Sequence, residues 1–210
     1  EGIAHAFILA EEFIGRNNVC LILGDNIFYG NGLTNLLKQS IEDLNKNSCS
    51  VFGYYVKDPN RYGVVEFNSD SKVISIEEKP IEPKSNFAVV GLYFYTNDVI
   101  EITKSLTPSK RGELEITSVN KEYLKKNKLN VKIMDKGYVW LDTGTVDSLL
   151  EANNFIQTIQ KRQGLKVGCI HEIAYRNGYI DRDKFSSIIE KFISTNYGIY
   201  LKEILENENN

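Results

Sequence analysis

The chain has 210 residues, a length that fits one domain or a core with an appendage. Hydrophobic residues make up 42% and charged residues 25%, which is typical of a globular protein and excludes a disordered tail, a collagen and a coiled coil. Lys and Arg number 25 against 28 Asp and Glu, which gives a net charge of −3. The basic residues do not cluster, so the sequence does not predict binding to nucleic acid.

The cysteines and histidines do not predict a metal centre. Three cysteines without CxxC spacing and two histidines argue against zinc. The longest apolar run, 87–94, is far shorter than the roughly 20 residues of a membrane helix. Because no secretory signal precedes the fold, we expect a cytoplasmic protein. The sequence begins at Glu1 without methionine and enters a helical pattern at once, so we expect that its beginning has been removed.

The first third of the chain predicts a parallel α/β arrangement. The apolar run 19–23 is typical of a strand buried on both faces. Leucine and isoleucine then recur at helical spacing over 33–44, and a second strand follows at 51–56. Because strands joined through a helix normally run parallel, this order favours a parallel α/β sheet.

The middle of the chain changes to strands joined by turns. Extended runs at 62–67 and 72–77 flank a hairpin-like turn at 68–70. A buried strand follows at 87–95, and Asn97 can cap the next helix. The pattern then predicts a helix at 113–126, a strand at 131–134, a strand-to-loop junction at 138–145 and a helix at 146–162 with Thr145 as its N-cap.

The C-terminal stretch, from about 165, indicates short helices with tyrosine and isoleucine stripes. No internal repeat or low-complexity linker interrupts the chain. We therefore predict an α/β core over 1–155 and a helical segment over 156–210.

Two aspartates stand out because each follows an apolar run and lies beside a glycine. They are Asp25, after Gly24, and Asp142, shortly before Gly144. In open α/β sheets ligands bind outside the carboxyl ends of strands, and two carboxylates there can share Mg²⁺ together with phosphate oxygens. The alternative is that each aspartate only closes a turn or caps a helix.

Three further positions fit either a ligand or a structural role. Glu78 can accept sugar hydroxyls and Lys79 can hold a phosphate, although the same residues equally suit a solvated strand end. Arg111 precedes a predicted helix and suits an anion contact, but the acidic residues beside it also suit the helix dipole. Gly63 at a strand start admits a ligand close to the backbone, or marks a bulge.

Together these segments resemble the glucose-1-phosphate thymidylyltransferases, the sugar nucleotidyltransferases that make dTDP-glucose. The resemblance covers essentially the whole chain and implies a mixed, mostly parallel Rossmann-like sheet flanked by helices, with a helical appendage. The matching stretches are GIAHAF (2–7), LGDNIFYG (23–30), RYGVVEF (61–67), EEKP (77–80), VGLYFY (90–95), RGELEIT (111–117), WLDTGT (140–145) and RQGLKV (162–167).

The resemblance also implies roles for individual residues. Asp25 and Asp142 would bind Mg²⁺ and, with Lys79, make up the catalytic residues. Glu78 would bind the glucose hydroxyls, and Lys79 the phosphate of glucose 1-phosphate. The implied substrate-binding residues are Gly2, as a contact to the thymine base, and Tyr62, Gly63, Glu78, Lys79, Val89, Tyr93, Arg111 and Trp140.

The implied reaction is an in-line attack of glucose 1-phosphate on dTTP, which releases pyrophosphate and forms dTDP-glucose for deoxysugar (rhamnose-type) and surface-polysaccharide synthesis. The expected partners are these two small molecules, with no nucleic acid and no membrane. Family members are usually homotetramers with a second nucleotide site at a subunit interface. Its positions here would be Tyr29, Gly30, Gly168, Glu172 and Ile173.

The family begins with a strand and a glycine-rich loop that holds the triphosphate, and this sequence shows neither. We therefore expect a hydrophobic sheet edge and an inactive chain. One hypothesis is the C-terminal portion of a dTDP-glucose-forming enzyme. The alternative is a catalytically silent module that binds sugar phosphate or only assembles subunits. A third hypothesis, a glycosyltransferase, is supported only by the DxD motif at 181–183, and Asp181 is better explained there as a helix cap.

Overall fold

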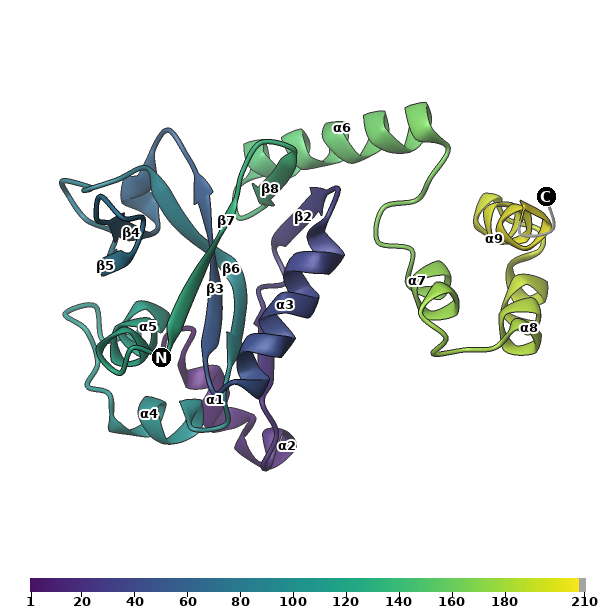
Figure 1. Ribbon diagram of the computed structural model, residues 1–210. Helices are drawn as coiled ribbons and strands as arrows, with labels where there is room; N and C mark the ends of the chain where they lie inside the picture. Colours follow the sequence, from purple (N-terminus) through teal and green to yellow (C-terminus); the bar gives the residue numbers. More distant parts are fainter. Residues whose placement is uncertain (208–210) are drawn as a thin grey trace. The chain divides into compact units, whose positions relative to one another are not determined.

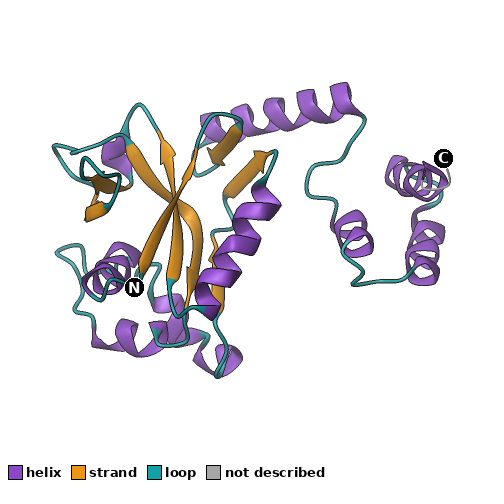
Figure 2. Ribbon diagram, in the orientation of Figure 1, coloured by secondary structure: helices purple, strands orange, loops and turns teal. Residues whose placement is uncertain are grey.

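The protein is described here by a computed structural model, which describes residues 1–207. The chain divides into two compact units, with the boundary between Ala152 and Asn153, close to the predicted boundary after residue 155. The first unit holds every strand of the described chain, and the second is helical (Figures 1 and 2).

A mixed sheet forms the centre of the first unit. Its strands are ordered β5-β4-β6-β3-β7, and β1 also pairs with β6. The bounds are β1 (Val19–Ile22), β3 (Cys49–Tyr55), β4 (Gly63–Phe67), β5 (Val73–Glu78), β6 (Phe87–Tyr95) and β7 (Leu129–Met134).

The mixed α/β class is confirmed, but the sheet is not mostly parallel. Only β3 and β7 pair in parallel among the described strands. The strand β6 runs antiparallel to β1, β3 and β4, and β4 runs antiparallel to β5. The short turn between β4 and β5 requires this direction, because hairpin connections join antiparallel strands. Because β1 and β3 both run antiparallel to β6, these two strands run in the same direction with β6 between them.

The strand β1 is less buried than its apolar sequence predicts. Val19 and Leu21 pack against the core, but Cys20 is exposed and Ile22 is 57% exposed. Within the described residues β1 pairs with β6 alone. The prediction of burial on both faces is therefore wrong.

A second, two-stranded sheet lies at one end of the first. It pairs β2 (Asn26–Gly30) with β8 (Tyr138–Asp142) in antiparallel register, with Asn26 opposite Asp142. The β8 strand was predicted, whereas β2 was not. This small sheet brings two segments more than a hundred residues apart to one place, and it carries both predicted acidic residues at one end.

Helices cover the main sheet on both faces. Alternate residues of a strand point to opposite faces, so Val51 packs into one core and Phe52 into the other. The first core includes Phe7 of α1 (His5–Leu9) and Val99 of α4 (Val99–Ser105), and the second includes Leu44 of α3 (Leu33–Asn45) (Figure 1). The remaining elements of this unit are α2 (Glu11–Ile14), the short 3-10 helix η1 (Pro59–Arg61) and α5 (Ile116–Lys125).

Two predicted helix starts differ from the structure. The α5 helix begins at Ile116 instead of residue 113, because Glu115 still has an extended backbone. Asn97 does not cap α4, since its amide donates to the carbonyls of Gly15 and Asn17, both at 2.9 Å. It therefore joins the loop after α2 to the loop after β6.

The second unit consists of helices with a core of their own. It holds the C-terminal part of α6 (Val146–Gln163), then α7 (Ile170–Arg176), α8 (Arg182–Phe192) and α9 (Asn196–Asn207), and Phe185 and Leu201 are fully buried in it. The predicted cap of α8 is confirmed, because Asp181 accepts a hydrogen bond from the Lys184 amide at 2.7 Å.

Thr145 is likewise confirmed as the cap of α6. Its hydroxyl accepts the Ser148 amide at 3.2 Å, and the Ser148 hydroxyl accepts the Thr145 amide at 3.1 Å. This reciprocal pair starts the helix directly after the second acidic residue of the small sheet.

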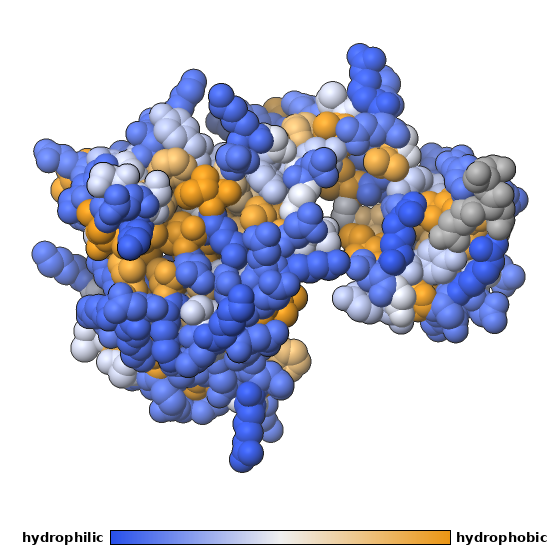
Figure 3. Space-filling view, viewed as in Figure 1, coloured by the Kyte–Doolittle hydropathy of each residue, from blue (hydrophilic) through white to orange (hydrophobic). Residues whose placement is uncertain are grey.

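Hydrophobic residues on the visible surface are gathered in patches bordered by hydrophilic ones (Figure 3). Over the described residues, no helix combines the length and the apolarity that crossing a membrane requires.

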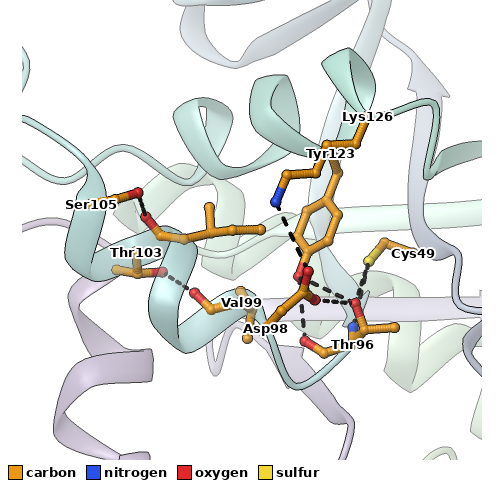
Figure 4. Close-up of polar contacts among 9 residues, drawn as sticks. Cys49, Thr96, Asp98, Val99, Thr103, Ser105, Tyr123 and Lys126 are labelled. Carbon is orange, nitrogen blue, oxygen red and sulfur yellow. Dashed lines mark hydrogen bonds and ion pairs between the residues drawn. The ribbon is translucent and has the colours of Figure 1, made fainter.

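A partly buried polar cluster joins the start of β3, the loop after β6 and α5 (Figure 4). Asp98 accepts hydrogen bonds from the hydroxyls of Thr96 and Tyr123, the latter at 2.8 Å, and Lys126 lies 4.0 Å away. Burial by itself would raise the pKa of Asp98, but these donors outweigh it and lower that pKa. The cluster therefore stabilises the first unit most when Asp98 is ionised.

We predict that Tyr123→Phe lowers the free energy of unfolding by about 1–2 kcal/mol at neutral pH, because it removes a hydrogen bond to a partly exposed charge. Since the folded-state pKa of Asp98 is lowered, its contribution is present above the unfolded value of about 3.9 and is lost as the pH falls through the folded value. The difference between wild type and variant should shrink in acid. Urea unfolding of wild type and Tyr123→Phe at neutral and at acidic pH measures this difference, and Tyr55→Phe, at an exposed tyrosine, is the control. Equal free energies of unfolding for wild type and Tyr123→Phe at neutral pH would contradict the role of this hydrogen bond.

Candidate active site

A cavity of about 330 Å³ opens in the first unit where the small sheet meets the main one. Its walls come from the start of β2, the start of β4, the end of β5, the middle of β6, the segment before α5 with the first residues of that helix, and the end of β8. Ten residues predicted from the sequence line it: Asp25, Tyr62, Gly63, Glu78, Lys79, Val89, Tyr93, Arg111, Trp140 and Asp142.

Gly2 is the predicted substrate-binding residue of this unit that does not line the cavity. It adopts a φ of +84°, and a β-carbon there would lie 2.4 Å from the carbonyl oxygen of Leu114. The next residue, Ile3, lines the cavity instead. Gly2 therefore lets the chain cross close to the segment before α5, and its contact with a base stays a prediction.

The two aspartates are held side by side by backbone pairing. Asp25 immediately precedes β2, and Asp142 is opposite Asn26 in the register of β2 and β8. The carbonyl of Asp25 accepts hydrogen bonds from both the amide and the hydroxyl of Thr143, each at 2.8 Å. The amide of Gly144 donates to Asp142 Oδ1 at 3.1 Å. These bonds hold the start of β2 and the end of β8 together at the residues that carry the carboxylates.

The two carboxylates border one open space. A β-carbon on Gly144 would lie 3.2 Å from Asp142 Oδ1 and 3.8 Å from Asp25 Oδ2, so the absence of a side chain at 144 keeps this space clear. The described residues contain no group of three or more His, Cys, Asp or Glu arranged to hold a metal. Two carboxylates suit Mg²⁺, which usually takes one or two of them and completes its octahedron with water and phosphate oxygens. The residues therefore fit this ion.

A second carboxylate group forms the facing wall. Glu78 Oε2 accepts a hydrogen bond from the Thr117 hydroxyl, and Glu78 Oε1 lies 3.9 Å from Arg111 Nη1. A β-carbon on Gly63 would lie 2.9 Å from Thr117 Oγ1 and 3.6 Å from Glu78 Oε2. The glycine predicted at the start of β4 is therefore required for this contact, and no bulge is needed to explain it.

The guanidinium of Arg111 is shared among acidic side chains. It lies 3.0 Å from Glu113, 3.6 Å from Glu115 and 3.9 Å from Glu78. Arg111 lines the cavity, and its contact with an anion stays a prediction. The alternative, that the acidic residues beside it suit the helix dipole, is wrong, because α5 begins only at Ile116 and its first turn holds no acidic residue. An anion that enters the cavity would compete with these carboxylates for the guanidinium.

Lys79 differs from Arg111 because none of the described carboxylates lies within 4.0 Å of its ammonium group. Its backbone has a φ of +43°, which is uncommon for a residue other than glycine, and its amide donates to the Tyr62 carbonyl at 2.9 Å. This conformation at the end of β5 directs the chain away from the sheet, and Lys79 lines the cavity as an unpaired cation.

Aromatic side chains complete the cavity. Trp140 packs edge-on against Tyr62 with ring centroids 5.1 Å apart, and Tyr93 is only 3% exposed. Burial, and then the charge of Glu78, raise the pKa of Tyr93, while burial and the nearby Asp142 raise that of Tyr62. Both phenols therefore stay protonated at neutral pH and can donate hydrogen bonds.

Sequence analysis overlooked several residues that line this cavity. Each of them lies in or beside a stretch quoted as a family motif, often next to a predicted residue, so adjacency to Asp25, Tyr62 or Arg111 was the available signal. They are Ile3, Leu23, Asn26, Arg61, Gly91, Glu113, Glu115, Ile116 and Thr117.

The predicted second nucleotide site is divided between the two units. Tyr29 and Gly30 belong to β2 in the first unit. Gly168, Glu172 and Ile173 belong to the second, where Glu172 pairs with Arg176 at 2.8 Å. Each set is described within its own unit, and their union in one site stays a prediction.

Comparison with known proteins gives consistent matches. A family model described as nucleotidyl transferase matches residues 1–159. The chain is 50% identical over 206 residues to the glucose-1-phosphate thymidylyltransferase of Neisseria meningitidis serogroup A, with 98% of this chain and 71% of that protein covered. It is 49% identical over 208 residues to the protein of the same name from Mycobacterium tuberculosis H37Rv, with 98% and 70% covered.

Solved structures agree with the fold. A crystal structure from Bacillus anthracis, described as a glucose-1-phosphate thymidylyltransferase in complex with sucrose, has a TM-score of 0.64 and 42% identity. A UDP-glucose pyrophosphorylase complexed with UDP-glucose has a TM-score of 0.65 and 26% identity. These matches cover 73% and 75% of this chain but only 60% and 62% of the solved chains.

We predict that Gly63→Ala lowers the free energy of unfolding by about 1–3 kcal/mol, because the new methyl group collides with Thr117 in a filled site. Gly24→Ala is the matched control, since a β-carbon there would meet no atom within 4 Å. Chemical denaturation of the two variants beside wild type measures the difference. If Gly63→Ala is no less stable than Gly24→Ala, the close packing of Gly63 against Thr117 is wrong.

Proposed function

The chain belongs to the nucleotidyl transferase family and, within it, to the glucose-1-phosphate thymidylyltransferases; on this basis we propose that it transfers a thymidylyl group from dTTP to glucose 1-phosphate. The products are dTDP-glucose and pyrophosphate. The observation that carries the proposal is the single cavity that holds the Asp25 and Asp142 carboxylates on one side and Glu78 and Lys79 on the other.

The wall formed by Glu78 and Lys79 suits a sugar phosphate. The Glu78 carboxylate is oriented by Thr117 and accepts hydroxyl hydrogens of the sugar, as carboxylates do. The absence of a side chain on Gly63 lets a sugar ring approach the backbone at the start of β4. Lys79 supplies an unpaired positive charge for the phosphate, and Arg111 adds a second cation at the same wall.

The opposite wall suits the reacting phosphate. Asp25 and Asp142 would hold Mg²⁺, which when bound supplies positive charge to phosphate oxygens. In the reaction an oxygen of glucose 1-phosphate forms a bond to the α-phosphorus of dTTP. The bond from that phosphorus to the bridging oxygen breaks, and pyrophosphate leaves with the electron pair. The side chains here align the two phosphates and offset their charge, and no covalent intermediate with the protein is needed.

We extend the proposal to the biological setting that the family resemblance implies. The base is thymine, the product enters deoxysugar synthesis of the rhamnose type, and the protein works in the cytoplasm as a homotetramer. The second nucleotide site, with Tyr29, Gly30, Gly168, Glu172 and Ile173, belongs to that assembly.

We predict that Asp142→Asn in a full-length version of the protein reduces Mg²⁺-dependent pyrophosphate release by at least about a hundredfold, because one of the two carboxylates that face the open space is lost. The thermal unfolding midpoint should stay close to that of wild type, since the asparagine oxygen can still accept the Gly144 amide. A coupled pyrophosphate assay with dTTP and glucose 1-phosphate gives the rate.

The control for this variant is Asp70→Asn, in the exposed turn between β4 and β5. Normal pyrophosphate release by Asp142→Asn would remove Asp142 from the metal site. A wild-type protein that binds glucose 1-phosphate but releases no pyrophosphate would favour the silent binding module instead.

We predict that Glu78→Ala raises the KM for glucose 1-phosphate about 10- to 100-fold, the range that loss of hydrogen bonds to a charged group produces, and leaves the KM for dTTP unchanged. Glu77→Ala is the matched control, because neighbouring residues of a strand face opposite sides and Glu77 does not line the cavity. Initial rates at varied concentrations of each substrate separate the two constants. An unchanged sugar dependence would show that Glu78 does not contact the sugar.

A further inference from the structure

The side-chain amide of Asn26, the first residue of β2, makes three hydrogen bonds at the cavity. Its oxygen accepts hydrogen bonds from Trp140 Nε1 at 2.7 Å and from the Gly91 amide at 3.1 Å. Its nitrogen donates to Asp25 Oδ1 at 2.8 Å. One side chain therefore connects β6, β8 and the acidic residue before β2.

The main sheet leaves room for this amide at Gly91. A β-carbon on Gly91 would lie 2.6 Å from Asn26 Oδ1 and 2.7 Å from the Leu23 side chain. Gly91 lies inside β6, where a glycine weakens a strand, so its presence there needs a local reason. Close approach of the Asn26 oxygen to the β6 backbone supplies that reason.

The two donors determine which way the amide faces. Because Trp140 Nε1 and the Gly91 amide can only donate, the Asn26 oxygen must point toward them and the nitrogen toward Asp25. Oδ1 of Asp25 is thereby occupied, and it is Oδ2 that borders the open space beside Gly144 and Asp142. The orientation of the Asp25 carboxylate thus depends on Asn26.

We propose that Asn26 is a positioning residue for a divalent cation: it orients the Asp25 carboxylate toward Asp142 and ties that orientation to the Trp140 wall of the cavity. The proposal rests on the proposed function, because it takes Asp25 and Asp142 as the residues that hold the ion. Hydrogen-bond partners of metal ligands commonly act in this way, since they hold the ligand in its binding rotamer.

The test measures binding of Mn²⁺ alone, an ion with the same preference for carboxylate oxygens as Mg²⁺, by the loss of the free-ion electron paramagnetic resonance signal. We predict that Asn26→Ala binds Mn²⁺ about tenfold more weakly than wild type, the lower end of the effect of losing such a partner. Trp140 is the single tryptophan, so its emission reports on the same side chain. The emission should shift to longer wavelength as its Nε1–H bonds to water.

Asn86→Ala is the matched control, because it also removes an amide that joins two segments: Asn86 Nδ2 donates to the Val56 carbonyl at 2.9 Å, outside the cavity. This variant should keep the wild-type affinity for Mn²⁺ and the wild-type emission. If circular dichroism shows that Asn26→Ala does not fold, Asn26→Ser is measured with the same expectation, because its hydroxyl is too short to span the three partners.

Wild-type Mn²⁺ affinity in the folded Asn26 variant would overturn the inference, and so would a wild-type protein that does not bind Mn²⁺. A different outcome would contradict the proposed function alone. A wild-type protein whose Mn²⁺ affinity depends on Asn26 but which releases no pyrophosphate would contradict thymidylyl transfer while leaving the positioning role in place.

Discussion

The pairing of β2 with β8 is the constraint on which the candidate site depends. Its register puts Asn26 opposite Asp142, and the Thr143 bonds to the Asp25 carbonyl extend the pairing by one step. The two carboxylates are thereby held beside one space. Glycine at 144 leaves this space open, as the proposed cation would require.

The rest of the cavity follows from the position of β6 in the main sheet. Because β6 pairs with β1, β3 and β4, its middle residues lie between the acidic pair and the wall that carries Glu78. Charge then differs along the cavity: the Asp25 and Asp142 carboxylates border the space beside Gly144, whereas the other wall combines the cations Lys79 and Arg111 with carboxylates. Carboxylates of that wall suit sugar hydroxyls, and its cations suit a phosphate.

Local sequence patterns predicted much of this structure, and tertiary pairing decided what they missed. The buried strand β6 and the caps Thr145 and Asp181 follow from residue type and spacing alone. The short β2 strand was missed because five residues after a loop carry little periodic signal. Parallel order was expected from the strand-helix-strand pattern, which does not reveal that β6 separates β1 from β3. Residue type and spacing made Asp25, Asp142 and Glu78 candidates, and the family resemblance added Val89 and Trp140. Asn26 became recognisable only through its three hydrogen-bond partners in the structure.

The central claim is that one cavity of the first unit binds both the sugar phosphate and the nucleotide part of the product. Thermal unfolding of the wild-type protein with Mg²⁺ and dTDP-glucose tests it most directly, with UDP-glucose in a parallel sample. A ligand at 100 times its dissociation constant stabilises the folded state by about 2.7 kcal/mol. The account predicts a clear rise of the unfolding midpoint with dTDP-glucose and a smaller one with UDP-glucose. No rise with either nucleotide sugar would contradict it.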